Sequence, residues 1–152
     1  MCIRDSYNYK KGPQRFEPHL KFVTDELLSN VASELGLTPR PETTILMGGS
    51  SAGSFALWGV MQRPDIFGHS VGTSPSGPIP ESISELAATR NYYTSAGYYE
   101  PGFLANAMLY KEELEKAGAE VDIASYPDGH SVDHRARRMV EVLPRIIPPN
   151  ND

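Results

Sequence analysis

The sequence has 152 residues, of which 39% are hydrophobic and 22% charged, a composition typical of one globular domain with a core of its own. The net charge of −5 argues against nucleic acid or an anionic membrane surface as the main partner, and no apolar run is long enough to insert into a membrane. The single cysteine, Cys2, excludes a disulfide framework within the chain and a cysteine-based zinc site. We recognise no signal peptide in the sequence, and the single cysteine does not fix the compartment.

The chain divides into a short start, one domain and a tail. Residues 1–6, Met-Cys-Ile-Arg-Asp-Ser, have neither a helical nor a strand period and join abruptly to a stretch rich in Tyr and Lys. We interpret them as a translated adapter and exclude them from the fold. Residues 7–147 form the predicted single domain, and residues 148–152 a Pro/Asn tail.

Hydrophobic periodicity predicts alternating helices and strands. Apolar residues at helical spacing predict a helix over 18–35, beginning at Pro18 and ending at Gly36. The later predicted strands are 43–47, 70–73, 91–96 and 120–126, and the later predicted helices are 52–62, 80–89, 101–117 and 132–146. This alternation predicts an α/β fold with a mostly parallel sheet of about four strands flanked by helices.

The turn between the strand 43–47 and the helix 52–62 carries the first chemical signal. Its spacing Gly49-x-Ser51-x-Gly53 is that of the nucleophile elbow of serine hydrolases, in which a strand reverses sharply into a helix. We expect Ser51 at the strained apex, with the amide of Ala52 and the helix N-terminus facing a developing oxyanion. A second register, Gly48-x-Ser50-x-Ala52, fits more loosely.

A serine nucleophile needs a base, and in the elbow fold the base follows the serine and the acid along the chain. His130 lies in Pro-Asp-Gly-His directly after the last predicted strand, where a loop can fold over the nucleophile. His19 is upstream of the serine, and His69 comes just before a strand. His134 is one helical turn beyond His130, and we expect its side chain to be solvated. His130 is therefore the predicted base.

Two carboxylates compete for the role of acid. Glu100 directly follows the predicted strand 91–96 and its short extension, at the end where sites assemble in open α/β sheets. Asp128 stands two residues before His130 in the same turn and is expected to bond its own backbone. We favour Glu100 and keep Asp128 as the alternative.

Several segments together resemble the enterochelin esterase/putative esterase family of α/β-hydrolases, which includes feruloyl and acetyl-xylan esterase-like members. The segments are Met47-Gly-Gly-Ser-Ser-Ala-Gly, Arg63-Pro-Asp-Ile-Phe-Gly, Gly97-Tyr-Tyr-Glu and Asp128-Gly-His-Ser. The resemblance implies the C-terminal half of an α/β-hydrolase fold, with Ser51 as nucleophile, Glu100 as acid, His130 as base and the Ala52 amide in the oxyanion hole. It implies neither a metal nor an organic cofactor.

The chain departs from the family pattern in two places. Asp128 replaces the first glycine of the family's Gly-Gly-His turn, and His134-Arg135 stand near the family's tryptophan. Both departures concern the substrate pocket more than the triad. The resemblance also implies that the first strands of the sheet and the loop carrying the second oxyanion amide are missing. We therefore expect an N-terminally truncated chain with an unpaired edge strand at 43–47, marginal stability and weak activity, since one lost oxyanion donor costs about 10²–10³ in rate.

The first functional hypothesis is a serine esterase that hydrolyses carboxylic esters of the siderophore, feruloyl or acetylated-sugar type through an acyl-enzyme. The expected partner is a small-molecule or carbohydrate ester. Aromatic residues near the acid either line its pocket or simply pack between strand and helix; they are Tyr92, Tyr93, Tyr98, Tyr99 and Phe103. The alternatives are a non-catalytic binding domain of the same fold and an acyltransferase.

Overall fold

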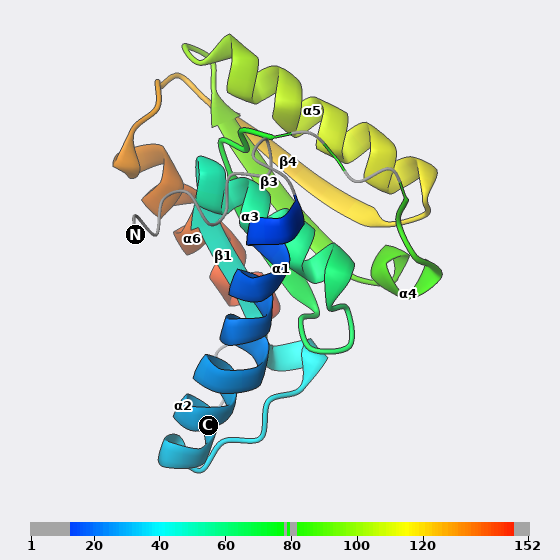
Figure 1. The fold of residues 1–152 in the computed structure, drawn as a ribbon. Coiled ribbons are helices and arrows are strands. Elements are labelled where there is room, and N and C mark those ends of the chain that lie inside the picture. Colours follow the sequence, from blue (N-terminus) through cyan, green and yellow to red (C-terminus); the bar gives the residue numbers. More distant parts are fainter. Residues whose placement is uncertain (1–12, 78, 80–81, 148–152) are drawn as a thin grey trace.

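A computed structural model describes residues 13–77, 79 and 82–147. The predicted start 1–6 and the tail 148–152 lie outside the described residues. The described chain forms one sheet of four parallel strands in the order β1-β2-β3-β4 (Figure 1). The strands are β1 (Ile45–Gly49), β2 (His69–Thr73), β3 (Asn91–Gly97) and β4 (Glu120–Tyr126). The predicted α/β class with a parallel sheet is confirmed.

Strand β1 lies two residues later than the predicted 43–47. Its start is delayed because Pro41–Thr43 forms a single 3₁₀ turn, η4, in which the Thr43 amide donates to the Arg40 carbonyl. Its end is extended because Gly48 and Gly49 stay in the ladder opposite Gly72 and Thr73 of β2. Among the described residues β1 pairs only with β2, so it lies at the edge of this sheet.

The N-terminal helical region is longer than predicted. It runs without interruption through α1 (Pro13–Lys21), the π-helical η3 (Phe22–Leu27) and α2 (Leu28–Leu35), and Gly36 ends it with a φ of 63°. The end at Leu35 is confirmed, but the start at Pro18 is wrong, because Pro18 lies inside α1. Burial explains the earlier start: the Phe16 ring, 4% exposed, packs edge-on against Phe55 at 5.2 Å.

The remaining helices follow the strands in turn. They are α3 (Ser51–Gln62), α4 (Glu85–Ala88), α5 (Pro101–Lys116) and α6 (Val132–Ile146). The predicted helices 52–62, 101–117 and 132–146 therefore agree with the structure to within a residue at each end. Of the predicted helix 80–89, the part within the described residues reduces to the single turn of α4.

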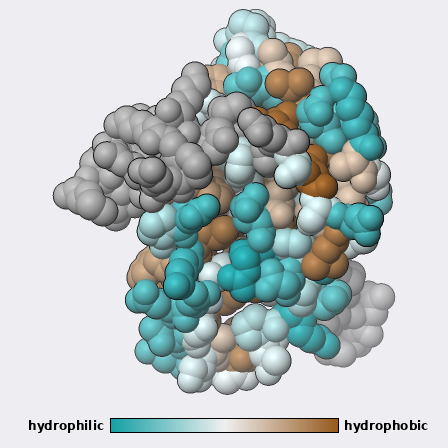
Figure 2. Space-filling model, turned by 45° about the vertical axis from the view of Figure 1, so that its right-hand side comes forward, coloured by the Kyte–Doolittle hydropathy of each residue, from teal (hydrophilic) through white to brown (hydrophobic). Residues whose placement is uncertain are grey.

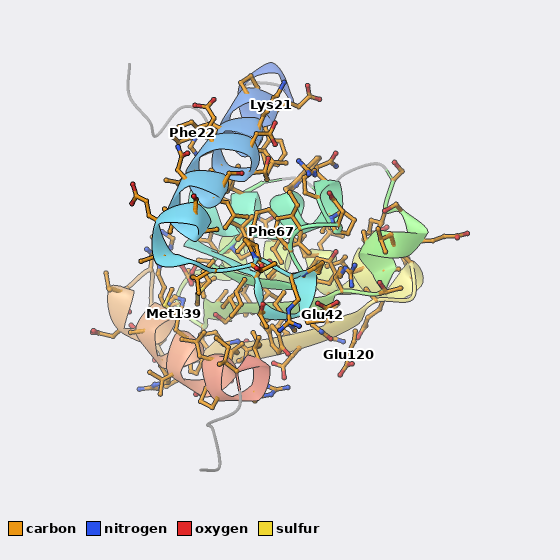
Figure 3. All side chains as sticks on the ribbon, turned by 90° about the horizontal axis from the view of Figure 1, so that it is seen from below. Lys21, Phe22, Glu42, Phe67, Glu120 and Met139 are labelled. Carbon is orange, nitrogen blue, oxygen red and sulfur yellow. The ribbon has the colours of Figure 1, made fainter. Side chains whose placement is uncertain are left out.

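The helices cover the two faces of the sheet unequally. Figure 3 shows the α1–α2 region, with Lys21 and Phe22, and α6, with Met139, on opposite sides of the sheet. Helix α3 lies between α1 and the strands, and its Gly59 gives room to Leu46 of β1 and Leu20 of α1. The main core lies on this face and contains Phe16, Leu20, Phe55, Leu57, Trp58, Val60, Met61, Phe67, Tyr92, Tyr110, Leu114, Ala119 and Val121.

In the view of Figure 2 hydrophobic side chains lie in separate groups among hydrophilic ones. Within the described part of the chain, no helix combines the length and the hydrophobicity needed to cross a bilayer.

The parallel arrangement brings distant parts of the sequence to one edge. Because all four strands run in the same direction, their carboxyl ends meet there. Ser50 follows β1, Ser74 follows β2, Glu100 comes three residues after β3, and His130 four residues after β4. The candidate catalytic side chains therefore all belong to loops at this edge.

Candidate active site

The apex of the elbow is Ser50. Its backbone has φ 61° and ψ −127°, a conformation that L-residues rarely adopt, whereas Ser51 already begins α3. The prediction that Ser51 occupies the strained apex is therefore wrong by one residue. The two serines are adjacent, and the second register, centred on Ser50, describes the turn.

Close backbone packing explains why small residues surround this apex. A Cβ on Gly48 would lie 2.1 Å from the carbonyl oxygen of Ala52, and a Cβ on Gly53 would lie 2.4 Å from the carbonyl oxygen of Thr73. Both distances are far inside van der Waals contact. The glycines that the turn requires sterically are thus two residues before Ser50 and three residues after it.

The first turn of α3 offers amide donors beside the apex. The carbonyl of Ser50 accepts hydrogen bonds from the amides of Gly53 and Ser54, at 2.9 and 3.2 Å. The amides of Ser51 and Ala52 belong to the first turn, where backbone N–H groups have no partner within the helix and the helix dipole favours negative charge. The hydroxyl of Ser51 accepts a bond from Ser76 at 3.3 Å.

Glu100 and His130 form a close pair. The carboxylate Oε2 lies 2.6 Å from Nδ1 of His130, and the side chain of Glu100 is 3% exposed whereas that of His130 is 37% exposed. The other oxygen, Oε1, accepts hydrogen bonds from the Ser74 hydroxyl at 2.6 Å and from the Gly97 amide at 2.7 Å. Burial alone raises the pKa of Glu100, but these bonds and His130 outweigh it, so that the pKa lies below its ordinary value. Glu100 is therefore a buried carboxylate.

This pairing sets the tautomer of His130. A proton on Nδ1 is needed to donate to Glu100, which leaves a lone pair on Nε2. The ring stacks on Phe103, with centroids 4.4 Å apart. Nε2 accepts a hydrogen bond from Nη2 of Arg135 at 2.8 Å. The Arg135 side chain also lies against the elbow, where a Cβ on Gly49 would be 2.8 Å from its Cδ.

Asp128 forms its hydrogen bonds within the loop that carries His130. Its Oδ1 accepts from the Gly129 amide at 2.7 Å and its Oδ2 from the Ser131 hydroxyl at 2.6 Å. The Ser131 bond, followed by that of Gly129, holds the pKa of Asp128 below its ordinary value. The expectation that Asp128 bonds its own backbone is confirmed, and the carboxylate that contacts His130 is Glu100.

Two residues of the site were not assigned to it from the sequence. The sequence pattern assigns no role to Ser74, yet it is fully buried, has φ 46° and bonds Glu100. His134 was expected to be solvated, which is wrong: it is 1% exposed, with Nε2 3.1 Å from Ser74 Oγ and Nδ1 3.0 Å from the Gly129 carbonyl. His134 is buried because the face of α6 that carries His134 and Arg138 lies toward the sheet. Its position one helical turn beyond His130 does not by itself indicate this orientation.

A chain of contacts connects the elbow to the acid–base pair. The amide of Ser50 donates to the Thr73 carbonyl at 2.9 Å, and the next residue, Ser74, bonds Glu100, which holds His130. The structure thus brings together the elbow, Glu100 and His130 at the carboxyl edge. Within the described ranges, no group of three His, Cys, Asp or Glu side chains is arranged to hold a metal ion.

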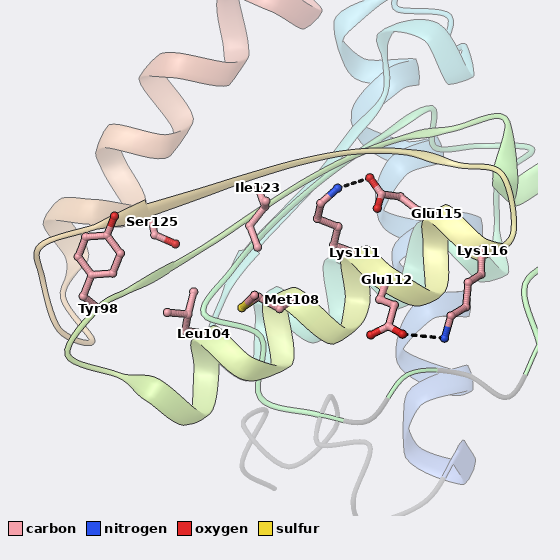
Figure 4. Close-up of a pocket in the computed structure, with 9 residues that line it drawn as sticks. All are labelled: Tyr98, Leu104, Met108, Lys111, Glu112, Glu115, Lys116, Ile123 and Ser125. Atoms are coloured by element: carbon pink, nitrogen blue, oxygen red, sulfur yellow. Dashed lines mark hydrogen bonds and ion pairs between the residues drawn. The ribbon is translucent and has the colours of Figure 1, made fainter.

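A groove lies away from this pair. It has a volume of about 800 Å³ and runs between α5 and β4, where Figure 4 shows Leu104, Met108 and Ile123 with the ion pair of Lys116 and Glu112 at its margin. The predicted aromatic residues are scattered: Tyr98 lines this groove, Tyr92 is buried in the core and Tyr99 is exposed. Of that set, Phe103 contacts the site.

A four-stranded parallel sheet flanked by helices is the fold of the α/β-hydrolase class. The sequence model of the family described as "Esterase: Putative esterase" matches residues 4–134, so the chain belongs to this family. A comparison with curated protein sequences finds no match.

Several solved structures share the fold of this chain. Enterobactin esterase FES from Shigella flexneri has a TM-score of 0.71 at 20% identity, over 82% of this chain and 35% of its own. A carboxylesterase from Mesorhizobium loti has a TM-score of 0.71 at 18% identity, over 91% and 64%. A ferulic acid esterase has a TM-score of 0.69 at 13% identity, over 83% and 59%. The chain thus spans between about a third and two thirds of these proteins.

Proposed function

We propose that the chain is the catalytic part of a serine esterase, with Ser50 as nucleophile, His130 as base and Glu100 as the acid that orients it. The observation that carries the proposal is a strained serine at a strand–helix apex on the same sheet edge as a buried Glu–His pair. Glu100 and His130 are the predicted residues. Ser50 replaces the predicted Ser51, because it holds the apex while the Ser51 hydroxyl faces the loop at Ser76.

The proposed reaction follows from these positions. The Ser50 hydroxyl oxygen attacks the ester carbonyl carbon while its proton passes to Nε2 of His130, and the Nδ1 proton stays on the bond to Glu100. The carbonyl oxygen becomes an oxyanion facing the first amides of α3, those of Ser51 and Ala52. Collapse breaks the ester C–O bond, and the alcohol leaves with the proton of His130. Water, activated by His130, then hydrolyses the acyl-serine.

Arg135 must move before this reaction can start. Its Nη2 donates to the same Nε2 lone pair of His130 that has to accept the serine proton. The guanidinium is always protonated and cannot itself act as the base. Rotation of the Arg135 side chain away from His130 is therefore part of the proposed cycle.

Labelling with a fluorophosphonate tests the proposal, because it needs only one attack by an activated serine. We expect one adduct per chain, located at Ser50 by peptide mass spectrometry. Ser50→Ala and His130→Ala should abolish it, and Ser51→Ala should retain it. An adduct that persists in Ser50→Ala, or no adduct in any variant, would contradict the proposal and favour a binding domain.

We propose carboxylic esters of the siderophore, feruloyl or acetylated-sugar type as substrates. The support is family membership together with the names of two structurally similar proteins, an enterobactin esterase and a ferulic acid esterase. Turnover of a panel of aryl, feruloyl and acetyl-sugar esters, with products analysed in the presence of added sugar, separates hydrolysis from acyl transfer.

A further inference from the structure

A second histidine is buried behind the acid–base pair and has no step in the proposed reaction. His134 is 1% exposed and lies in the first turn of α6, where its Nε2 is 3.1 Å from the Ser74 hydroxyl and 3.7 Å from Oε1 of Glu100. Its Nδ1 is 3.0 Å from the Gly129 carbonyl. A buried imidazole with polar partners on both nitrogens is a defined element of the site.

The contacts of His134 fix where its protons are. The Gly129 carbonyl can only accept, so Nδ1 must carry a proton. The Ser74 hydroxyl has one proton, and it lies in the 2.6 Å bond to the carboxylate of Glu100, which can only accept. Toward His134, Ser74 therefore presents only lone pairs, and Nε2 must carry a proton as well.

A protonated Glu100 would be the other way to fill these contacts, and its surroundings disfavour it. The carboxylate already receives donors from Ser74, from the Gly97 amide and from His130. Three donors stabilise the ionised form, and the pKa of Glu100 accordingly lies below its ordinary value. The extra proton of the network thus belongs on His134.

Charged and titratable groups of both signs surround His134. Glu100 faces it across Ser74, and the Asp128 carboxylate stands in the preceding turn and interacts with it electrostatically. The Tyr126 ring stacks on the imidazole at 6.0 Å, and the Arg137 guanidinium lies on the Tyr126 ring at 5.3 Å. The two carboxylates are the groups that compensate a buried positive charge.

We propose that His134 is an imidazolium which, through the Ser74 hydroxyl, holds the Glu100 carboxylate ionised and aimed at His130. His134 is then a positioning residue, and the pair becomes a four-membered chain, His134–Ser74–Glu100–His130. The assignment of protons is argued from the contacts of His134, Ser74 and Glu100, whereas the kinetic consequence rests on the proposed esterase function. The positive φ of Ser74 is a backbone strain that places its hydroxyl between the Glu100 carboxylate and the His134 imidazole.

Nitrogen NMR of the histidine rings at pH 7 tests the protonation directly on the unmodified chain. We expect both ring nitrogens of His134 to carry protons, and His130 to carry one on Nδ1 alone. The signals are assigned with His134→Gln and His130→Gln. An unprotonated Nε2 on His134 overturns the proposal, whether or not the chain is an enzyme.

The positioning role has its own readout in the Nδ1 proton of His130. In Ser74→Ala and His134→Phe this proton should exchange faster with water, because Glu100 loses its support. His69→Gln is the matched control: His69 begins the strand that Ser74 follows, and its Nε2 contacts the Glu42 carbonyl at 3.1 Å, away from the site. Unchanged exchange in both test variants would overturn the role.

Labelling kinetics separate positioning from simple structural support. We expect His134→Phe to slow fluorophosphonate labelling on the order of tenfold, the loss of a hydrogen bond within a charged network. In a Glu100→Gln background the same substitution should change the rate little, because its effect passes through Glu100. Equal slowing in both backgrounds would overturn the proposal. If the parent chain never labels, the esterase function fails while the NMR result still decides the charge on His134.

Discussion

Replacing Ser50 by glycine should stabilise the fold while abolishing labelling. A non-glycine residue held at φ 61° and ψ −127° costs about 1–3 kcal/mol of strain, which glycine does not pay. Against this, glycine increases the backbone entropy of the unfolded state, which destabilises the fold by about 0.4–1 kcal/mol. The net gain is about 0.5–2 kcal/mol, which in a chain of this length raises the Tm by about 1–8 °C. Thermal and urea unfolding of the parent and of Ser50→Gly measure it.

Two matched variants make this prediction sharp. Ser50→Ala also removes the hydroxyl but keeps the Cβ and hence the strain, so its Tm should stay near that of the parent. Ser51→Gly places glycine at the first helical position of α3, where nothing is strained, and should destabilise the chain by up to about 1 kcal/mol. A Ser50→Gly chain no more stable than Ser50→Ala, or a Ser51→Gly chain more stable than either, would refute the assignment of the apex.

Three further predictions concern the surroundings of the pair. Arg135→Ala should speed fluorophosphonate labelling by up to about tenfold, since it frees Nε2 of His130, and slower labelling would contradict the need for Arg135 to leave. Gly97→Ala should slow labelling and lower the Tm, because its Cβ would lie 2.0 Å from a carbonyl of the loop that carries His130, whereas Gly102→Ala, with open space around it, should be neutral or slightly stabilising. Acid should destabilise the chain, because the pKa of Glu100 is lowered in the folded state. The contribution of Glu100 to stability is present above about pH 4.5 and is lost as pH falls from there through the folded pKa. Glu100→Gln should make the free energy of unfolding, measured with urea, less dependent on pH over that range.

The sequence predicts the fold well because its signals are local. The strand Glu120–Tyr126 and the helix Val132–Ile146 follow from alternation and helical spacing, and the structure has the same bounds. The start of the first helix is different in kind. Pro18 is a good local signal for a helix start, but burial of Phe16 against Phe55 and Trp58 extends the helix to Pro13. Such contacts join positions about forty residues apart, and no local pattern contains them.

The identity of the apex serine depends on contacts of the same distant kind. Gly48, Gly49 and Gly53 give both Ser50 and Ser51 small neighbours, so spacing alone allows two registers. The structure separates them because Gly53 faces the backbone of Thr73 in the neighbouring strand and Gly48 faces the first turn of α3. Which serine, Ser50 or Ser51, occupies the apex thus depends on packing against β2, a strand that begins well after the turn itself.

The order of the strands also explains why Ser74 has its place in the site. Because the sheet runs β1-β2-β3-β4, the end of β2 lies between the elbow after β1 and the acid after β3. Two adjacent residues there each contact one of them: Thr73 accepts from the Ser50 amide, and Ser74 donates to Glu100. A short hydroxyl side chain at a positive φ is small enough to be buried there and still bond to the carboxylate and to His134. The same parallel order that gathers the proposed triad therefore creates a central position whose side chain can tune it.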